Sequence, residues 1–233
     1  MSTRNVHLFV FDSMSDWQAA FAIAGINTPR FQTSHGRYRV VTVGSTTKPI
    51  TTMGGIRVIP DVSLAEIHPH HSSMLILPGG DSWESGGNTD ALELARAFFV
   101  DAVPIAAICG ATLALACAGM LNDFHHTSNS RAYLSRTGYR GGSFYLEAPA
   151  VTDESLITAS GTAPVEFARE IFRTLRNCQR AAEVSLTGRQ FNNSSAAQRA
   201  LNGFGRILPA GRKEDREKKS GYRDKPHAAE AQT

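Results

Sequence analysis

The chain has 233 residues, of which 42% are hydrophobic, and a formal net charge of +3. This length favours one domain with a sizeable core. The sequence has neither an apolar run of about 18 residues, which a membrane span requires, nor the features of a secretory signal at its start. Three cysteines without metal-type spacing are typical of a reducing compartment. We therefore expect a soluble, cytoplasmic protein.

The charge is distributed unevenly along the chain. Residues 177–233 carry 11 Lys and Arg against 6 Asp and Glu, whereas residues 1–176 carry 13 against 15. Because the first part has no basic excess, nucleic acid is not an expected partner. Hydrophobic periodicity decays after residue 176, apart from a weak amphipathic piece at residues 196–208. We predict a domain over 1–176 and a basic, largely disordered tail over 177–233 with at most a short helix.

Within the first 176 residues, patterns typical of strands alternate with patterns typical of helices. In chain order they predict a strand at Val6–Phe11, a helix at Asp16–Ile26, a strand at Tyr38–Val43, a hairpin within Pro49–Pro60 and a strand at Met74–Leu77. A helix at Thr89–Val100, a strand at Pro104–Ile108, a helix at Ala111–Met120, a strand at Ser155–Ala159 and a helix at Val165–Leu175 follow.

This alternation predicts an α/β fold with a mostly parallel sheet that helices cover on both faces. In such sheets, ligands and catalytic groups gather beyond the carboxyl ends of the strands. Pro78-Gly79-Gly80 and Cys109 each follow a predicted strand directly. We therefore expect these two distant motifs to meet in one site.

Cys109 stands between the apolar run 105–108 and a helix of small residues. A cysteine in the first turn of a helix meets backbone N–H groups and the positive end of the helix dipole, and both stabilise a thiolate. A plain buried cysteine is an equally common occupant of such a position. From the residues alone, Cys109 is either a nucleophile or a structural core residue.

Three segments together resemble the DJ-1/PfpI superfamily, which is related to the class I glutamine amidotransferases. They are the elbow 106-AAICGAT-112, the glycine turn 77-LPGG-80 and the strand–turn–helix 157-ITASGTAPVEFA-168. The resemblance covers about residues 5–176. It implies a flavodoxin-like three-layer sandwich with a mostly parallel sheet, a homodimer and a reactive Cys109. We expect no cofactor and no metal.

The resemblance also assigns roles to residues around the sulfur. Cys109 matches the elbow cysteine of the family, and the backbone N–H groups of Gly80 and Gly110 match its oxyanion hole. Where the family places Glu or Asp on the first helix, this chain has Gln18, which can donate a hydrogen bond but cannot act as an acid or a base. Asp16 is expected to face elsewhere, and Asp12 is a further acidic candidate.

The general base is open in this sequence. Some members of the family carry His near the end of the next strand, and the aligned residue here is Asn129. His126 is three residues earlier and is kept as a candidate base, although on a strand it would point to the other face. The late His-x-Glu pair of true glutaminases is absent, so glutamine hydrolysis is not expected.

We therefore expect either a cysteine-dependent hydrolase or lyase acting on a small carbonyl or amide-like substrate, or a non-enzymatic redox or stress protein in which Cys109 is reversibly oxidised. Two further features are expected to be structural. Cys117 is expected in the core, and His68, His70 and His71 in a solvated loop rather than a metal site.

Overall fold

The computed structural model describes residues 3–28 and 38–186, with side chains up to residue 176. Its centre is a seven-stranded sheet with the order β5-β2-β1-β6-β7-β9-β8. The strands are β1 (Arg4–Phe9), β2 (Tyr38–Gly44), β5 (Val62–Ser63), β6 (Met74–Leu77), β7 (Ile105–Ile108), β8 (Ala150–Asp153) and β9 (Leu156–Ala159). All neighbouring pairs are parallel except β8 with β9.

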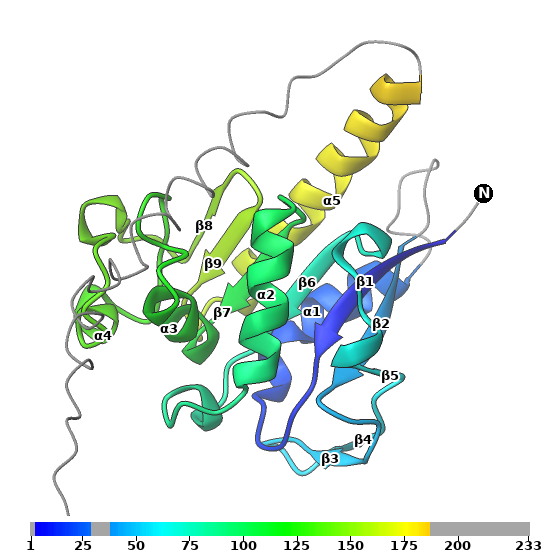
Figure 1. The fold of residues 1–233 in the computed structure, drawn as a ribbon, viewed down its shortest axis with the longest axis horizontal. Helices are drawn as coiled ribbons and strands as arrows, with labels where there is room; N and C mark the ends of the chain where they lie inside the picture. Colours follow the sequence, from blue (N-terminus) through cyan, green and yellow to red (C-terminus); the bar gives the residue numbers. More distant parts are fainter. Residues whose placement is uncertain (1–2, 29–37, 187–233) are drawn as a thin grey trace, which may run out of the picture.

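Helices cover both faces of this sheet and make the three layers of a flavodoxin-like α/β fold (Figure 1). On one face, α1 (Asp16–Asn27) packs against α5 (Pro164–Leu186), and α2 (Thr89–Val100) lies on the other. Two shorter helices are α3 (Gly110–Cys117) and α4 (Arg131–Ser135). The antiparallel pair β3 (Ile50–Thr51) and β4 (Arg57–Val58) forms the expected hairpin.

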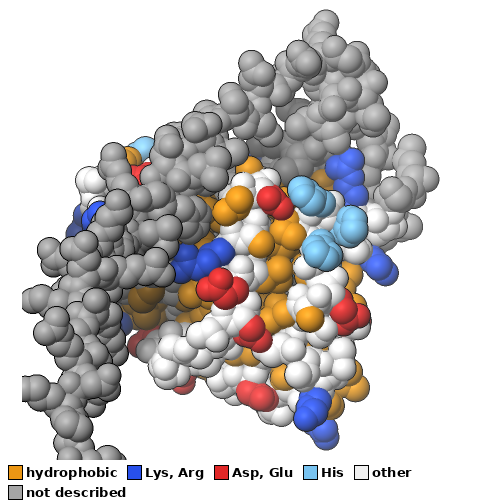
Figure 2. Space-filling view, viewed as in Figure 1, with side chains coloured by type: hydrophobic (Ala, Val, Ile, Leu, Met, Phe, Trp, Pro, Cys, Tyr) orange, Lys and Arg blue, Asp and Glu red, His pale blue; other side chains and the backbone are white. Residues whose placement is uncertain are grey.

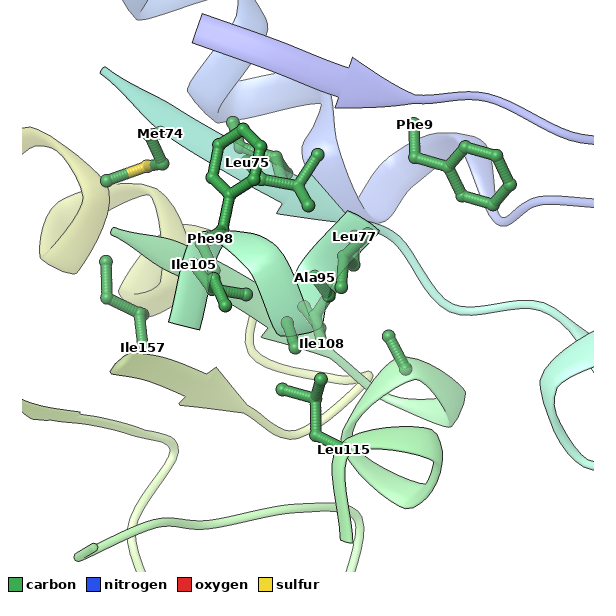
Figure 3. Packing of buried hydrophobic residues seen from close by; sticks show 14 of the residues in the cluster. Phe9, Met74, Leu75, Leu77, Ala95, Phe98, Ile105, Ile108, Leu115 and Ile157 are labelled. Atoms are coloured by element: carbon green, nitrogen blue, oxygen red, sulfur yellow. The ribbon is translucent and has the colours of Figure 1, made fainter. Parts of the chain in front are cut away.

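The central strands are buried on both faces, which explains their uninterrupted apolar sequences. Every residue of β6 and β7 is buried, and Phe98 of α2 packs over Leu75 and Ile105 (Figure 3). Fully burying one such side chain stabilises the fold by about 1.5–3 kcal/mol. The core thus fixes the positions at which β6 and β7 end.

The sequence predicts most elements within a few residues. The observed bounds of β6 and α2 equal the predicted ones, whereas α3 ends at Cys117 rather than Met120. Gly119 has a φ of 76°, and the N–H groups of Gly119 and Met120 donate to the carbonyls of Ala116 and Leu115. This left-handed glycine cap ends the helix.

The last helix is longer than the sequence pattern predicts. It begins at Pro164 and continues to Leu186, beyond the expected boundary at residue 176. The short helix expected at residues 196–208, and the rest of the expected tail, lie outside the described residues. In the described part of the chain, no helix combines the length and the apolar character needed to cross a membrane.

Candidate active site

The carboxyl ends of β6, β7 and β9 bring three turns together. Gly79 and Gly80 follow β6, Cys109 follows β7, and Gly161 comes shortly after β9. The start of α1 is attached to the same edge, because the Ser15 N–H donates to the Gly79 carbonyl at 2.9 Å. The two motifs that were expected to meet therefore do so.

Cys109 occupies a strained turn between β7 and α3. Its φ of 59° and ψ of −124° lie in a region that residues with side chains rarely adopt. Its N–H donates to the Ala159 carbonyl at 3.1 Å, and the Thr112 hydroxyl donates to the Cys109 carbonyl at 2.6 Å. These bonds hold the strained turn in place, as in the nucleophile elbows of hydrolases.

Two glycines enclose the sulfur so closely that no side chain fits at either position. A Cβ at Gly79 would lie 3.1 Å from the Cys109 Sγ, and one at Gly161 would lie 2.8 Å from it. The 2.8 Å distance is shorter than real Cβ contacts, and the 3.1 Å distance is tighter than nearly all of them. Gly79 and Gly161 therefore let the backbone of two loops approach the cysteine from different sides.

Gln18 lies beside the same two glycines and is only 1% exposed. Its Oε1 accepts the Gly79 N–H at 2.7 Å. Because the Gly79 N–H can only donate to the oxygen of the Gln18 carboxamide, the NH2 group of Gln18 points in the opposite direction. It faces Gly161 and the cavity at Cys109. This NH2 group has no acceptor among the described residues, and Gln18 makes no hydrogen bond to the sulfur.

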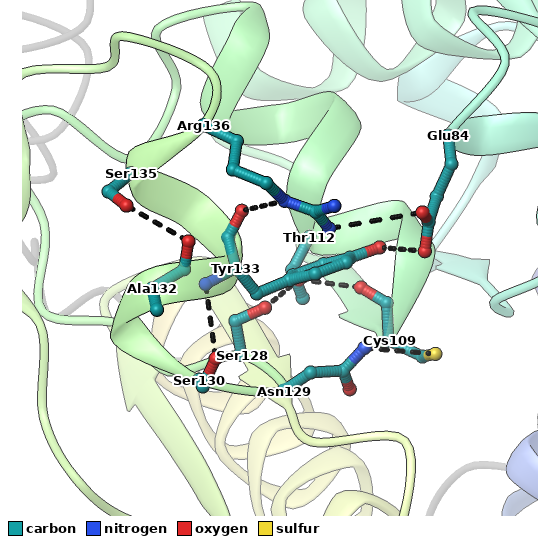
Figure 4. Close-up of polar contacts among 10 residues, drawn as sticks. All are labelled: Glu84, Cys109, Thr112, Ser128, Asn129, Ser130, Ala132, Tyr133, Ser135 and Arg136. Atoms are coloured by element: carbon teal, nitrogen blue, oxygen red, sulfur yellow. Dashed lines mark hydrogen bonds and ion pairs between the residues drawn. The ribbon is translucent and has the colours of Figure 1, made fainter.

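The carboxamide of Asn129 is also oriented by a glycine N–H, and its NH2 group contacts the sulfur. Its Oδ1 accepts the Gly161 N–H at 2.9 Å, so its NH2 group is turned towards Cys109 and donates to Sγ at 3.4 Å (Figure 4). Each carboxamide thus has its oxygen fixed by a glycine N–H. Of the two carboxamides, Asn129 donates to the sulfur, whereas Gln18 does not reach it.

Gly80 and Gly110, the two residues whose backbone N–H groups the family resemblance assigns to an oxyanion hole, line the cavity next to Cys109. Within the described part of the chain, neither N–H has an acceptor. Gly110 is also the first residue of α3, where N–H groups have no partner in the helix. Two unpaired N–H groups beside a cysteine can hold an oxygen that becomes negative during attack on a carbonyl.

The structure places His126 away from the sulfur. Its Nδ1 lies 2.7 Å from the Phe124 carbonyl and its Nε2 lies 3.1 Å from the Tyr139 hydroxyl. Burial lowers the pKa of His126 below its usual value. The ring does not line the Cys109 cavity, so no geometry supports a direct role as its base.

The acidic candidates of the first helix region are engaged elsewhere. Asp12 accepts the Thr51 N–H at 2.8 Å, and Asp16 accepts the Gly54 N–H at 2.6 Å. Both carboxylates attach the β3–β4 hairpin to the sheet and α1. Asp16 thus faces away from Cys109, as the helix periodicity predicts.

The cavity above Cys109 has a volume of about 630 Å³. Trp17 and Met53 contribute apolar surface, whereas Asp81 and Glu84 contribute carboxylates. Trp83 is not a wall of this cavity, because it is 3% exposed and its Nε1–H donates to the Pro78 carbonyl at 2.8 Å. It packs under the glycine turn and supports it.

Tyr133 lies beside the cavity and binds one of its carboxylates. The Tyr133 hydroxyl donates to Glu84 Oε1 at 2.9 Å, and Arg136 lies over the Tyr133 ring at 4.7 Å from its centroid (Figure 4). Burial, followed by the bond to Glu84, raises the pKa of Tyr133 well above its usual value. Its hydroxyl therefore stays protonated and keeps donating.

The other cysteine with a described side chain lies outside the core. Cys117 is exposed, so the expectation of a buried residue was wrong. It lies at the end of α3, where the helix meets its glycine cap. Nearly every residue of α3 is apolar, so the sequence pattern does not show which of its positions face solvent.

The histidine-rich segment forms a short turn at the surface. His68, His70 and His71 are exposed, and Figure 2 shows histidines gathered on the face that carries α2. His70 Nε2 lies 3.5 Å from an Asp101 carboxylate oxygen. Across the residues with described side chains, no three His, Cys, Asp or Glu are grouped to hold a metal.

Comparisons with known proteins agree with this architecture. The sequence profile of the DJ-1/PfpI family matches residues 4–174. The chain is 44% identical to the "uncharacterized protease YoaZ" of Bacillus subtilis, over 75% of this chain and 85% of that protein. It is 28% identical to the "glutathione-independent glyoxalase DJR-1.2" of Caenorhabditis elegans, over 60% and 75%.

Comparison with a solved structure indicates the same family. The crystal structure of a DJ-1 superfamily protein from Agrobacterium tumefaciens superposes with a TM-score of 0.68 at 34% identity, covering 74% of this chain and 90% of that one. Fold, elbow and sequence profile thus define one class of α/β protein. The chain belongs to the DJ-1/PfpI family.

Proposed function

We propose that this protein is a cysteine-dependent enzyme that attacks a small carbonyl or amide-like substrate through the Cys109 thiolate. The observation that carries the proposal is the strained Cys109 turn, with the Asn129 NH2 group 3.4 Å from its sulfur. Relatives named as a protease and a glyoxalase support chemistry at a carbonyl carbon.

In the proposed reaction, the thiolate forms a C–S bond to the substrate carbonyl carbon, and the π electrons move to the carbonyl oxygen. The N–H groups of Gly80 and Gly110 then donate to this oxyanion. Gln18 and Asn129 cannot accept a proton, so the thiol proton leaves to water before the attack. Any later proton transfer to a leaving group also comes from water or from another residue of the cavity.

A second candidate function is reversible oxidation of Cys109 without turnover. Peroxide would oxidise the thiolate to a sulfenate, which a thiol can reduce again, and the donor groups of Asn129 and Gln18 would stabilise the sulfenate oxygen. A homodimer is also proposed. Trp17 and Phe21 on α1 are 49% and 54% exposed, and a second copy would remove this apolar surface from water.

Turnover assays with a matched pair of cysteine variants test the main proposal. Wild type, Cys109→Ser and Cys117→Ser are assayed with methylglyoxal and model amides, and each is weighed by intact-mass analysis after mild peroxide. We expect Cys109→Ser to lose activity about a thousandfold or more and Cys117→Ser to keep it. Oxidation confined to Cys109 without turnover of any substrate would support the redox role, and an inert Cys109 would exclude both.

A further inference from the structure

The cavity above Cys109 changes polarity from its floor to its mouth. The carboxamides of Gln18 and Asn129 line the cavity together with Cys109, whereas its other titratable side chains are those of Asp81 and Glu84. Among the described residues, no Lys, Arg or His lines it. A substrate would therefore meet hydrogen-bond donors at the floor and negative charge at the mouth.

A second cavity of about 440 Å³, which Asn129 also lines, is acidic as well. The two cavities share Asn129 and Thr162 in their walls. The second one adds the carboxylates of Glu147 and Glu166, and its described lining also has no basic side chain. The two cavities therefore adjoin at Asn129 and Thr162, and we refer to them together as the acidic groove.

Glu84 is the carboxylate that the fold positions most firmly. Tyr133 donates to its Oε1 at 2.9 Å, and Arg136 lies 3.9 Å from its Oε2. On the far side of the groove, Arg131 lies 4.0 Å from Glu147. Both arginines are exposed and line neither cavity, and exposed ion pairs of this kind are weak.

The amide of Gln18 indicates what the floor of the groove would bind. Gln18 is 1% exposed, and its NH2 group reaches the cavity without an acceptor among the described residues. An NH2 group that borders a cavity can donate to an acceptor that enters the cavity. An acceptor oxygen on a substrate, such as the carbonyl oxygen that Cys109 would attack, supplies the missing partner.

We propose that the substrate is a carbonyl or amide compound that also carries a positive charge, such as an ammonium or guanidinium group. Its carbonyl is held by the donors around Cys109, and its cationic group is held by Glu84 and Asp81 at the mouth. A longer substrate continues across Asn129 towards Glu147 and Glu166. This inference rests on the proposed function of Cys109 and adds a substrate class to it.

Charged thiol reagents test this without knowledge of the substrate. The intact protein is treated separately with a cationic trimethylammonium-ethyl methanethiosulfonate and an anionic sulfonato-ethyl methanethiosulfonate of similar size. Peptide mass spectrometry follows Cys109 and Cys117, and the exposed Cys117 serves as the internal reference. The ratio of cationic to anionic rate cancels differences in thiolate content, because both reagents attack the same thiolate.

We expect this ratio to be at least about tenfold higher at Cys109 than at Cys117, and to fall as salt is added. Glu84→Gln and Asp81→Asn should each lower the Cys109 ratio about threefold to tenfold, as expected for the loss of one nearby negative charge. Arg136→Gln should raise it. Asp90→Asn, an exposed carboxylate on α2 outside the cavity lining, is the matched control and should leave it unchanged.

The outcomes separate this inference from the proposed function. If Cys109 reacts readily but with the same ratio as Cys117, or if Glu84→Gln and Asp81→Asn leave its ratio unchanged, the cationic substrate class is wrong while the nucleophile stands. If Cys109 reacts with neither reagent, the proposed function fails and this inference fails with it.

Discussion

Cys109 and Cys117 lie at opposite ends of the same helix, and their surroundings differ in every respect that matters for reactivity. Cys109 precedes the first residue of α3 in a strained turn, between two glycines and beneath a cavity. Cys117 is the last residue of α3 and is exposed beside a glycine cap. The comparison teaches that the sheet edge, rather than the cysteine or its helix, builds the site.

Substituting a glycine beside Cys109 should have the largest effect on the difference in reactivity between Cys109 and Cys117. Gly161→Ala would place a Cβ 2.8 Å from the Sγ and also disturb the N–H that fixes Asn129. We expect Cys109 to react with iodoacetamide at least tenfold more slowly, and the protein to lose about 1–3 kcal/mol of stability. Cys117 should react as before, because it lies at the other end of α3.

Gly142→Ala is the matched control for this change, since a Cβ at Gly142 would meet nothing within 4 Å. Its alkylation rates and melting temperature should stay at wild-type values. A Gly161→Ala protein that folds and alkylates Cys109 at the wild-type rate would contradict the packing argument.

Much of the site's framework could be predicted from the sequence. The Cys109 elbow and the Gly80 turn each follow an apolar run of strand length, and parallel sheets place such positions at one edge. The periodicity also predicted that Asp16 faces away from the sulfur, which its bond to Gly54 confirms. These features depend on local patterns, which a single sequence carries.

The remaining features depend on contacts between distant segments. Gly161 contacts Cys109 and orients Asn129, and Tyr133 binds Glu84, but no local pattern connects these residues. The short elements β5, β8 and α4 have too few residues for a clear period. Each owes its conformation to neighbouring elements rather than to its own sequence.

Asn129 offers a second, more moderate way to test the surroundings of Cys109. Asn129→Asp keeps an oxygen for the Gly161 N–H but replaces the donor near the sulfur with a second oxygen. Negative charge at about this distance should slow iodoacetamide alkylation of Cys109 about tenfold. Asn122→Asp is the control, because the Oδ1 of Asn122 likewise accepts a backbone N–H, that of Arg140. Equal rates in the two variants would mean that Asn129 does not stabilise the thiolate.

His126 gives the smallest expected effect on the site and the clearest effect on acid stability. Burial lowers the pKa of His126, and burial together with Arg39 lowers that of His7 to about 4. A histidine whose pKa is lower in the folded state favours folding above the unfolded value of about 6.5, and this contribution is lost as the pH falls below it. Both histidines should therefore reduce stability as the pH falls from 7 to 5, and for His7 the loss is about 2 kcal/mol.

His126→Gln removes one of these two titrations while keeping polar atoms near Phe124 and Tyr139. Its melting temperature should fall less between pH 7 and pH 5 than that of wild type, whereas its Cys109 alkylation rate at pH 7 should stay within about twofold. His126 and Asn129 are separated by only a few residues, yet only Asn129 reaches the sulfur. A large loss of Cys109 reactivity in a well-folded His126→Gln protein would show that His126 influences the site from the core, and would remove the distinction between the two residues.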